Sequence, residues 1–171
     1  MATDDPFIIN NNIPLVAPPT LDLDGDNNLT GNDYDTNYFV GGSPIAIADD
    51  VLIGDLDNAN LQSANIYLKT RPDGDAAESL LVNGALPVGI TTTGFDDVTG
   101  RLELTGDAPI ADYQTAIAQI EYSNTIGLQT SDRLIEMTLN DGISNSNLAL
   151  TTIGMKQPPI IDLDGDDSSF I

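Results

Sequence analysis

The chain has 171 residues, of which 27 are acidic and five basic, and it contains neither cysteine nor histidine. With so few cations at a net charge of −22, we expect no nucleic-acid partner and no binding to anionic membranes, since both require basic patches. The missing residue types exclude disulfides, thiol catalysis and the commonest transition-metal ligands, which leaves oxygen donors suited to Ca²⁺ or Mg²⁺. No segment approaches ~18 consecutive apolar residues, so we also expect no membrane insertion.

A short acidic motif occurs at both ends of the chain. Asp22-Leu23-Asp24-Gly25-Asp26 follows Pro18-Pro19, and the same five residues return 140 positions later after Pro158-Pro159. Such self-similarity predicts one period of a tandem array. We therefore divide the chain into a start with the tail of a preceding unit (1–17), one repeat (18–157) and the start of the next repeat (158–171).

The spacing of this motif is typical of a calcium loop. Asp22, Asp24 and Asp26 match its positions one, three and five, and Asn28 is available at position seven. Asn27 stands where an EF-hand loop requires glycine, and no flanking helices are evident, so we favour a calcium site at a joint between repeats. A solvated acidic linker is the alternative interpretation. The corresponding ligands of the second copy are Asp162, Asp164 and Asp166.

Between residues 43 and 156 the apolar residues alternate in short runs, which is the period of half-buried strands. Ile135, Met137 and Leu139 form one such run, and turn sequences such as Asn83-Gly84 separate the runs. One stretch differs, because apolar residues near 109–118 are spaced by three or four, which predicts a short helix. We expect an all-β fold, a sandwich of two antiparallel sheets with about seven strands and one short helix.

Four segments in this region resemble the cadherin-like repeats of giant bacterial RTX-type adhesins, and the likeness extends over 18–167. The segments are Gly94–Gly106, Ala111–Ile117, Glu121–Thr125 and Leu139–Gly142. The resemblance implies an immunoglobulin-like or cadherin-like β-sandwich with Ca²⁺ at the joints between repeats. It also implies export by a type I secretion machine to the bacterial cell surface or the extracellular space, and a role in attachment or biofilm formation.

The resemblance adds three ligands. Asp55-Leu56-Asp57 is similar to the Asp-x-Asp element with which a cadherin-type domain reaches the linker before it, so it is expected to share the site of the Asp22 loop. Asp141 is similar to the acid of a later calcium-facing loop, although Asn-Asp-Gly is also an ordinary turn sequence. The ligands at the far joint stay open. We interpret three other acidic pairs as solvated loop residues: Asp49 and Asp50, Asp73 and Asp75, and Asp96 and Asp97.

These observations favour a non-enzymatic, calcium-binding extender domain of a secreted adhesin. Its partners would be the adjacent repeats of the same polypeptide, and the isolated fragment would be a monomer. Calcium would stiffen each joint because the linker and the adjoining domain would share ligands. The alternative is a calcium-dependent, lectin-like module that binds a cell-surface or matrix polysaccharide. No acid stands opposite a nucleophile in a pattern that predicts catalysis.

Overall fold

The computed structural model describes residues 16–26 and 31–158, which form a mostly β structure. The strands are β1 (Thr20–Asp22), β2 (Tyr34–Phe39), β3 (Ile45–Ala46), β4 (Leu52–Gly54), β5 (Asn60–Leu68), β6 (Glu78–Val82), β7 (Thr91–Asp96), β8 (Arg101–Pro109), β9 (Ile120–Asn124), β10 (Arg133–Asn140) and β11 (Ala149–Lys156). The helix α1 spans Ile110–Ala118, as the spacing of three and four predicted.

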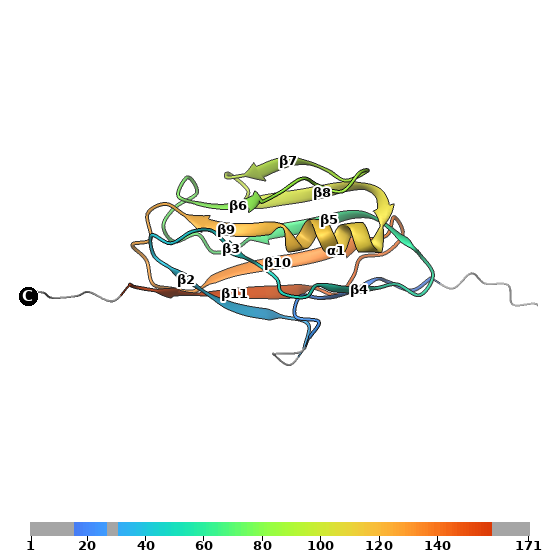
Figure 1. The fold of residues 1–171 in the computed structure, drawn as a ribbon, viewed down its shortest axis with the longest axis horizontal. Coiled ribbons are helices and arrows are strands. Elements are labelled where there is room, and N and C mark those ends of the chain that lie inside the picture. The colour runs from blue at the N-terminus through green and yellow to red at the C-terminus, as the bar shows by residue number, and fades with distance from the viewer. Residues whose placement is uncertain (1–15, 27–30, 159–171) are drawn as a thin grey trace, which may run out of the picture.

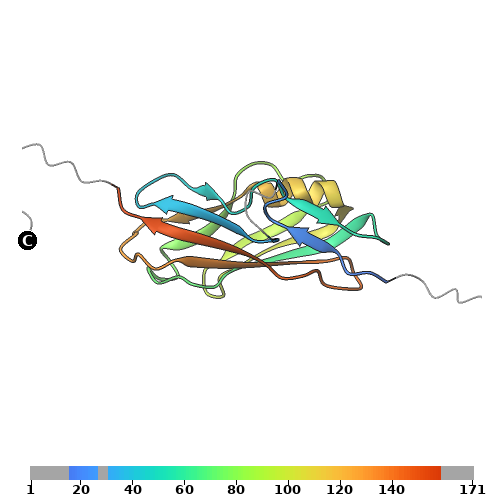
Figure 2. The same cartoon turned by 90° about the horizontal axis from the view of Figure 1, so that it is seen from below.

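The strands form two packed layers (Figures 1 and 2). One layer is a six-stranded sheet in the order β2-β11-β10-β5-β8-β7. The other contains the three-stranded sheet β3-β9-β6, the two-stranded sheet β1-β4 and α1. The prediction of an all-β sandwich is therefore confirmed.

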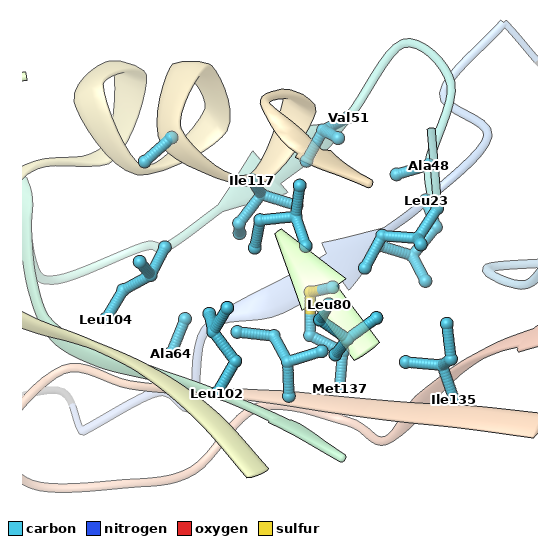
Figure 3. Close-up of a cluster of buried hydrophobic side chains, with 14 of the residues drawn as sticks. Leu23, Ala48, Val51, Ala64, Leu80, Leu102, Leu104, Ile117, Ile135 and Met137 are labelled. Atoms are coloured by element: carbon cyan, nitrogen blue, oxygen red, sulfur yellow. The ribbon is translucent and has the colours of Figure 1, made fainter. Parts of the chain in front are cut away.

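The core lies between these layers (Figure 3). Every second residue of β10 is buried, including Ile135, Met137 and Leu139, so the alternation predicted for this strand is confirmed. Ile117 of α1 and Leu80 of β6 close the core from the other layer. Burial of one face explains why each of these strands needs a two-residue period.

Two details of the predicted fold were wrong. The structure has eleven strands in its described residues rather than about seven, because β1, β3 and β4 have three, two and three residues. Strands this short contain too few residues to show a period. The sheets are also not purely antiparallel, since β2 pairs with β11 in parallel, with Tyr34 opposite Thr151 and Phe39 opposite Lys156. The chain passes from β1 in one layer to β2 in the other, and β2 then runs in the direction of the final strand.

The strand directions define two ends of the sandwich. Leu68 at the end of β5 lies near Arg101 and Arg133, which begin β8 and β10, and β11 ends beyond them at Lys156. We call this end the C-terminal pole. The opposite end, the N-terminal pole, contains Ala17 and the loops 55–58 and 141–147. The chain enters the described fold at one pole and leaves it at the other (Figure 1).

Candidate functional site

The loop after β4 forms an acidic turn at the N-terminal pole. Asp55 Oδ1 accepts hydrogen bonds from the backbone N–H groups of Asp57 and Asn58, each at 3.1 Å. An aspartate that caps the backbone two residues later is a common turn device, and it explains why Asp-x-Asp folds tightly here. The turn directs the Asp57 side chain toward the incoming chain, where its Oδ1 accepts the N–H of Ala17 at 3.0 Å.

Asn58 joins this turn to the loop after β10. Its Nδ2 donates to Asp141 Oδ2 at 3.1 Å. The other oxygen of Asp141 accepts the N–H groups of Ile143 and Ser144 at 2.7 and 2.6 Å. Burial by itself would raise the pKa of Asp141, but these backbone hydrogen bonds and the one from Asn58 outweigh it and hold the pKa below its ordinary value. Asp141 is thus kept as a carboxylate, the form that binds metal ions.

Asp55 has a second oxygen with a different environment. Its Oδ2 is buried and accepts no hydrogen bond in the part of the chain that the structure describes. A buried carboxylate oxygen without a donor is costly, and a bound cation is one of the few groups that could compensate it. This oxygen lies in the same turn as Asp57 and one hydrogen-bonded residue away from Asp141.

The Asp22 loop lies elsewhere. Asp22 is the last residue of β1 and its Oδ1 accepts the N–H of Asp24. The register pairs Thr20 with Gly54 and Asp22 with Leu52, which places Asp22 roughly 10 Å along the strand from Asp55. Asp24 is 1% exposed and forms a bridge with Asp49, farther still from the pole.

The sequence-predicted ligands therefore divide into groups. The structure brings Asp55, Asp57 and Asp141 together at the N-terminal pole, and it places Asp22, Asp24 and Asp26 beside the loop between β3 and β4. Within residues 16–26 and 31–158, no three acidic side chains lie close enough to one another to hold a metal ion by themselves. The remaining predicted ligands lie outside the described residues: Asn28, Asp162, Asp164 and Asp166.

Two asparagines complete the pole and were missed in the sequence. Asn58 links the two acidic loops, while Asn147 exchanges two hydrogen bonds with the backbone of Leu21, at 2.8 and 2.9 Å. Asn58 directly follows the Asp-x-Asp element, and this adjacency is the one local signal that could have identified it. Nothing in the local sequence distinguishes Asn147 from the other loop asparagines.

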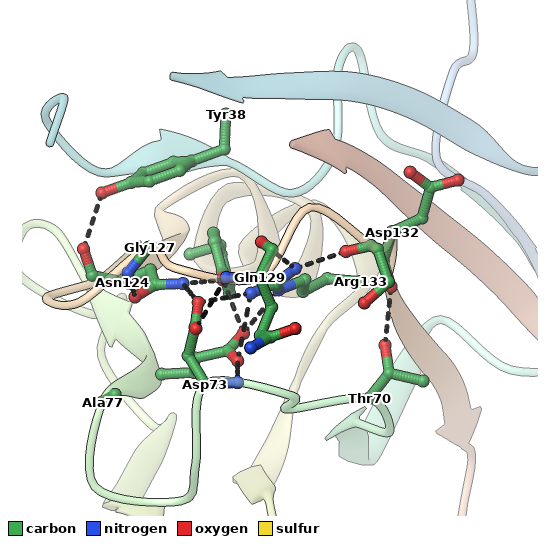
Figure 4. Close-up of polar contacts among 12 residues, drawn as sticks. Tyr38, Thr70, Asp73, Ala77, Asn124, Gly127, Gln129, Asp132 and Arg133 are labelled. Carbon is green, nitrogen blue, oxygen red and sulfur yellow. Dashed lines mark hydrogen bonds and ion pairs between the residues drawn. The ribbon is translucent and has the colours of Figure 1, made fainter. Parts of the chain in front are cut away.

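One acidic pair was wrongly interpreted as solvated. Asp75 is exposed, but the side chain of Asp73 is 1% exposed and its Oδ2 pairs with the fully buried Arg133 at 2.7 Å. Figure 4 shows this contact at the centre of a polar cluster near the C-terminal pole. Asp73 is buried because Arg133 and Asn124 both donate to its Oδ2. The pairs Asp49-Asp50 and Asp96-Asp97 are exposed, as expected.

The polar cluster contains two more groups that satisfy its charges. Glu78 Oε2 accepts from Arg133 Nε at 2.8 Å and from the Tyr122 hydroxyl at 2.6 Å. Burial, followed by the hydrogen bond to Glu78, raises the pKa of Tyr122, which keeps its hydroxyl protonated as a donor. Each of these groups is hydrogen-bonded to another residue of the cluster. The cluster therefore stabilises the fold at the C-terminal pole.

No protein-family model, curated protein or solved structure matches this chain. The one helix found in the described residues, α1, has nine residues, too few to cross a bilayer.

Proposed function

We propose that this chain is a non-enzymatic, calcium-binding extender domain of a secreted bacterial repeat adhesin, and that Ca²⁺ stiffens its joint with the preceding unit. The observation that carries the proposal is the buried Oδ2 of Asp55, which accepts no hydrogen bond from any described residue and lies at the same pole as Asp57 and Asp141. Ca²⁺ accepts carboxylate, amide and backbone oxygens in variable geometry, and this pole offers all three types.

The contact between Ala17 and Asp57 supports a role at a joint. It ties the chain that enters the domain to the acidic turn, so an ion held there would fix the entering chain relative to the sandwich. The described ends lie at opposite poles, which suits a domain that extends a fibre. The acidic composition supports the same proposal, because bound cations would relieve the self-repulsion of a net charge of −22.

Calorimetric titration and thermal melts of the chain test the calcium site. At a calcium concentration of about 100 times Kd, the added stability is about 2.7 kcal/mol, which corresponds to a rise in Tm of roughly 5–10 °C over the value in chelator. Magnesium should raise Tm less, because it demands a stricter octahedral geometry.

Matched variants locate the site. Asp55→Asn and Asp141→Asn should each reduce the heat of calcium binding and the Tm rise, since each removes a charged ligand from the N-terminal pole. Asp97→Asn is the control, because Asp97 is exposed at the opposite pole. Identical melting curves of the natural chain in calcium and in chelator would refute the proposal. The lectin-like alternative would be favoured instead if the isolated domain bound sugar in a calcium-dependent way and Asp55→Asn left calcium binding unchanged.

A further inference from the structure

The positive charges of this chain are confined to one half of the molecule. Arg101 and Arg133 begin strands at the C-terminal pole, Lys69 and Arg71 follow the end of β5 there, and Lys156 ends β11. These are all five basic side chains of the sequence. The N-terminal pole, which contains Asp55, Asp57, Asp107 and Asp141, has none. Basic side chains are therefore found at one pole only, whereas carboxylates lie at both.

Lys156 differs from the other four cations. Lys69, Arg71, Arg101 and Arg133 all pair with carboxylates of their own domain. Lys156 is exposed and forms no ion pair with any described residue. Among the described residues of a chain with 27 acidic side chains, Lys156 is thus a cation at one tip of the fold that pairs with none of them, which makes it a candidate for pairing with another domain.

The repeat period determines what lies next to Lys156. The return of the acidic motif after 140 positions makes residue 157 the equivalent of Ala17, and Lys156 the equivalent of Val16. Ala17 is already held by Asp57 of its own domain through a 3.0 Å hydrogen bond. Lys156 is still the last residue of β11, where its carbonyl accepts the N–H of Val40 at 2.9 Å.

No residues are thus left for a free linker between consecutive copies. β11 ends at Lys156, and the next residue, 157, is the one whose N–H would be hydrogen-bonded to Asp57 of the next copy. One residue spans at most ~3.6 Å. In a tandem array of this period, the C-terminal pole of one copy would therefore lie against the N-terminal pole of the next. Lys156 would then lie beside the acidic turn of Asp55 and Asp57.

Each pole also has an exposed apolar side chain that lies beside a charged residue. Phe39 is 57% exposed and pairs directly with Lys156 in the β2–β11 register. Leu56 is 83% exposed and lies between Asp55 and Asp57 in the acidic turn. Each pole therefore presents an exposed apolar residue next to a charge, with opposite signs at the two poles. Burying such residues against each other stabilises a contact in proportion to the apolar area removed from water.

From these observations we infer that the C-terminal pole is a docking surface for the N-terminal pole of a second copy of this unit, with Lys156 and Phe39 against Asp57 and Leu56. The inference rests on the tandem arrangement within the proposed function but does not require calcium. It means that the joint has its own ion pair and apolar contact, so that neighbouring copies are aligned even before a metal ion binds.

A protein with two tandem copies, joined at the natural 140-residue period, tests the contact in chelator at low salt. Spin labels on the two copies should give a single narrow distance distribution, and the second copy should melt roughly 2–4 °C higher than the single chain. Lys156→Glu in the first copy should broaden the distribution and remove this Tm rise. Adding Asp57→Lys in the second copy should restore part of both, because the reversed ion pair returns but the hydrogen bond that Asp57 accepts at the joint does not.

Two further variants keep the result interpretable. Phe39→Ser should weaken the contact without a large effect on the single chain, because the side chain is largely exposed there. Lys69→Glu is the control, since Lys69 lies at the same pole but is already paired with Glu136 of its own domain. A broad distance distribution for the natural pair, or equal effects of Lys156→Glu and Lys69→Glu, would overturn the inference. Failure of calcium binding would refute the proposed metal site but would leave this result unchanged.

Discussion

Arg133 Nε donates to Glu78 Oε2 at 2.8 Å, and both side chains are fully buried. They belong to strands in different layers, since β10 lies in the six-stranded sheet and β6 in the three-stranded sheet. Arg133 also pairs with Asp73 in the loop before β6, so one guanidinium serves two carboxylates. Buried charges of this kind are tolerated only when every one is paired and hydrogen-bonded. The pair therefore connects the two layers at the C-terminal pole.

Arg133→Met should destabilise the domain by about 3–5 kcal/mol, because it leaves Glu78 and Asp73 buried without a counter-charge. Lys69→Met is the matched control, since the Lys69–Glu136 pair lies at the surface and is partly exposed, and surface pairs contribute about 0–1 kcal/mol. Urea denaturation measures both. Adding Glu78→Gln to Arg133→Met should recover part of the loss. Equal losses for Arg133→Met and Lys69→Met would show that the buried network contributes no more than a surface pair.

Acidification should also weaken this pole through Asp73. Burial acts to raise the pKa of Asp73, but the hydrogen bonds from Asn124 and Gln129 and the charge of Arg133 together hold it below its ordinary value of 3.8. The unfolded chain then takes up a proton at Asp73 more readily than the folded one. Stability is full above the ordinary pKa and falls as the pH drops through the lowered one.

Denaturation measured between pH 7 and pH 3 detects this effect. Asp73→Asn should lower stability at pH 7 and make its dependence on pH shallower below about pH 4. Asp75→Asn provides the comparison, because Asp75 is exposed in the same loop. The explanation fails if both variants keep the acid slope of the natural chain.

Gly106→Ala should be among the most damaging single-methyl changes in the domain. Gly106 has φ +141°, and a Cβ there would lie 1.8 Å from the carbonyl oxygen of Gly89. Its own carbonyl accepts the Tyr113 hydroxyl at 2.7 Å, so the backbone cannot shift without breaking that bond. We expect a loss of about 3 kcal/mol or more, from strain and overpacking together.

Gly94→Ala separates the steric effect from the backbone effect. Gly94 also has a positive φ, +86°, but a Cβ there meets nothing within 4 Å. It should cost only the left-handed conformation, about 1–2 kcal/mol. Thermal or urea denaturation of the two variants gives the difference, and similar losses would mean that the contact with Gly89 is relaxed at little cost.

Asp24→Ala and Asp57→Ala should have independent effects on stability in calcium. The register of β1 and β4 separates the two loops by more than the range in which mutations usually couple, so the free energies of unfolding should add within about 0.5 kcal/mol. A double-mutant cycle measures the coupling. A coupling of 1 kcal/mol or more would indicate that both loops bind one ion cluster, as expected from the sequence alone.

The local properties of this protein could be predicted from its sequence. Alternation identified β10 because one face of that strand is buried, and spacing by three and four identified α1 because one side of the helix packs on the core. The end of β6 at Asn83-Gly84 could be predicted, because Gly84 forms a bend with φ +135°, which side chains rarely adopt. The period of 140 residues can be identified from the sequence alone, because the acidic motif occurs twice.

The tertiary structure decided which distant residues meet. Asn58 reaches Asp141 across 83 positions, and Arg133 reaches Asp73 across 60, so no local pattern distinguishes the metal-site candidate Asp141 or the buried Asp73 from ordinary turn residues. The parallel pairing of β2 with β11 likewise depends on the order of strands in the sheet. Strand periodicity reports only which face of a segment is buried, whereas the partners of a loop carboxylate depend on how the strands before and after it are ordered. The strand directions, set by the fold, are also what bring all five cations to one pole.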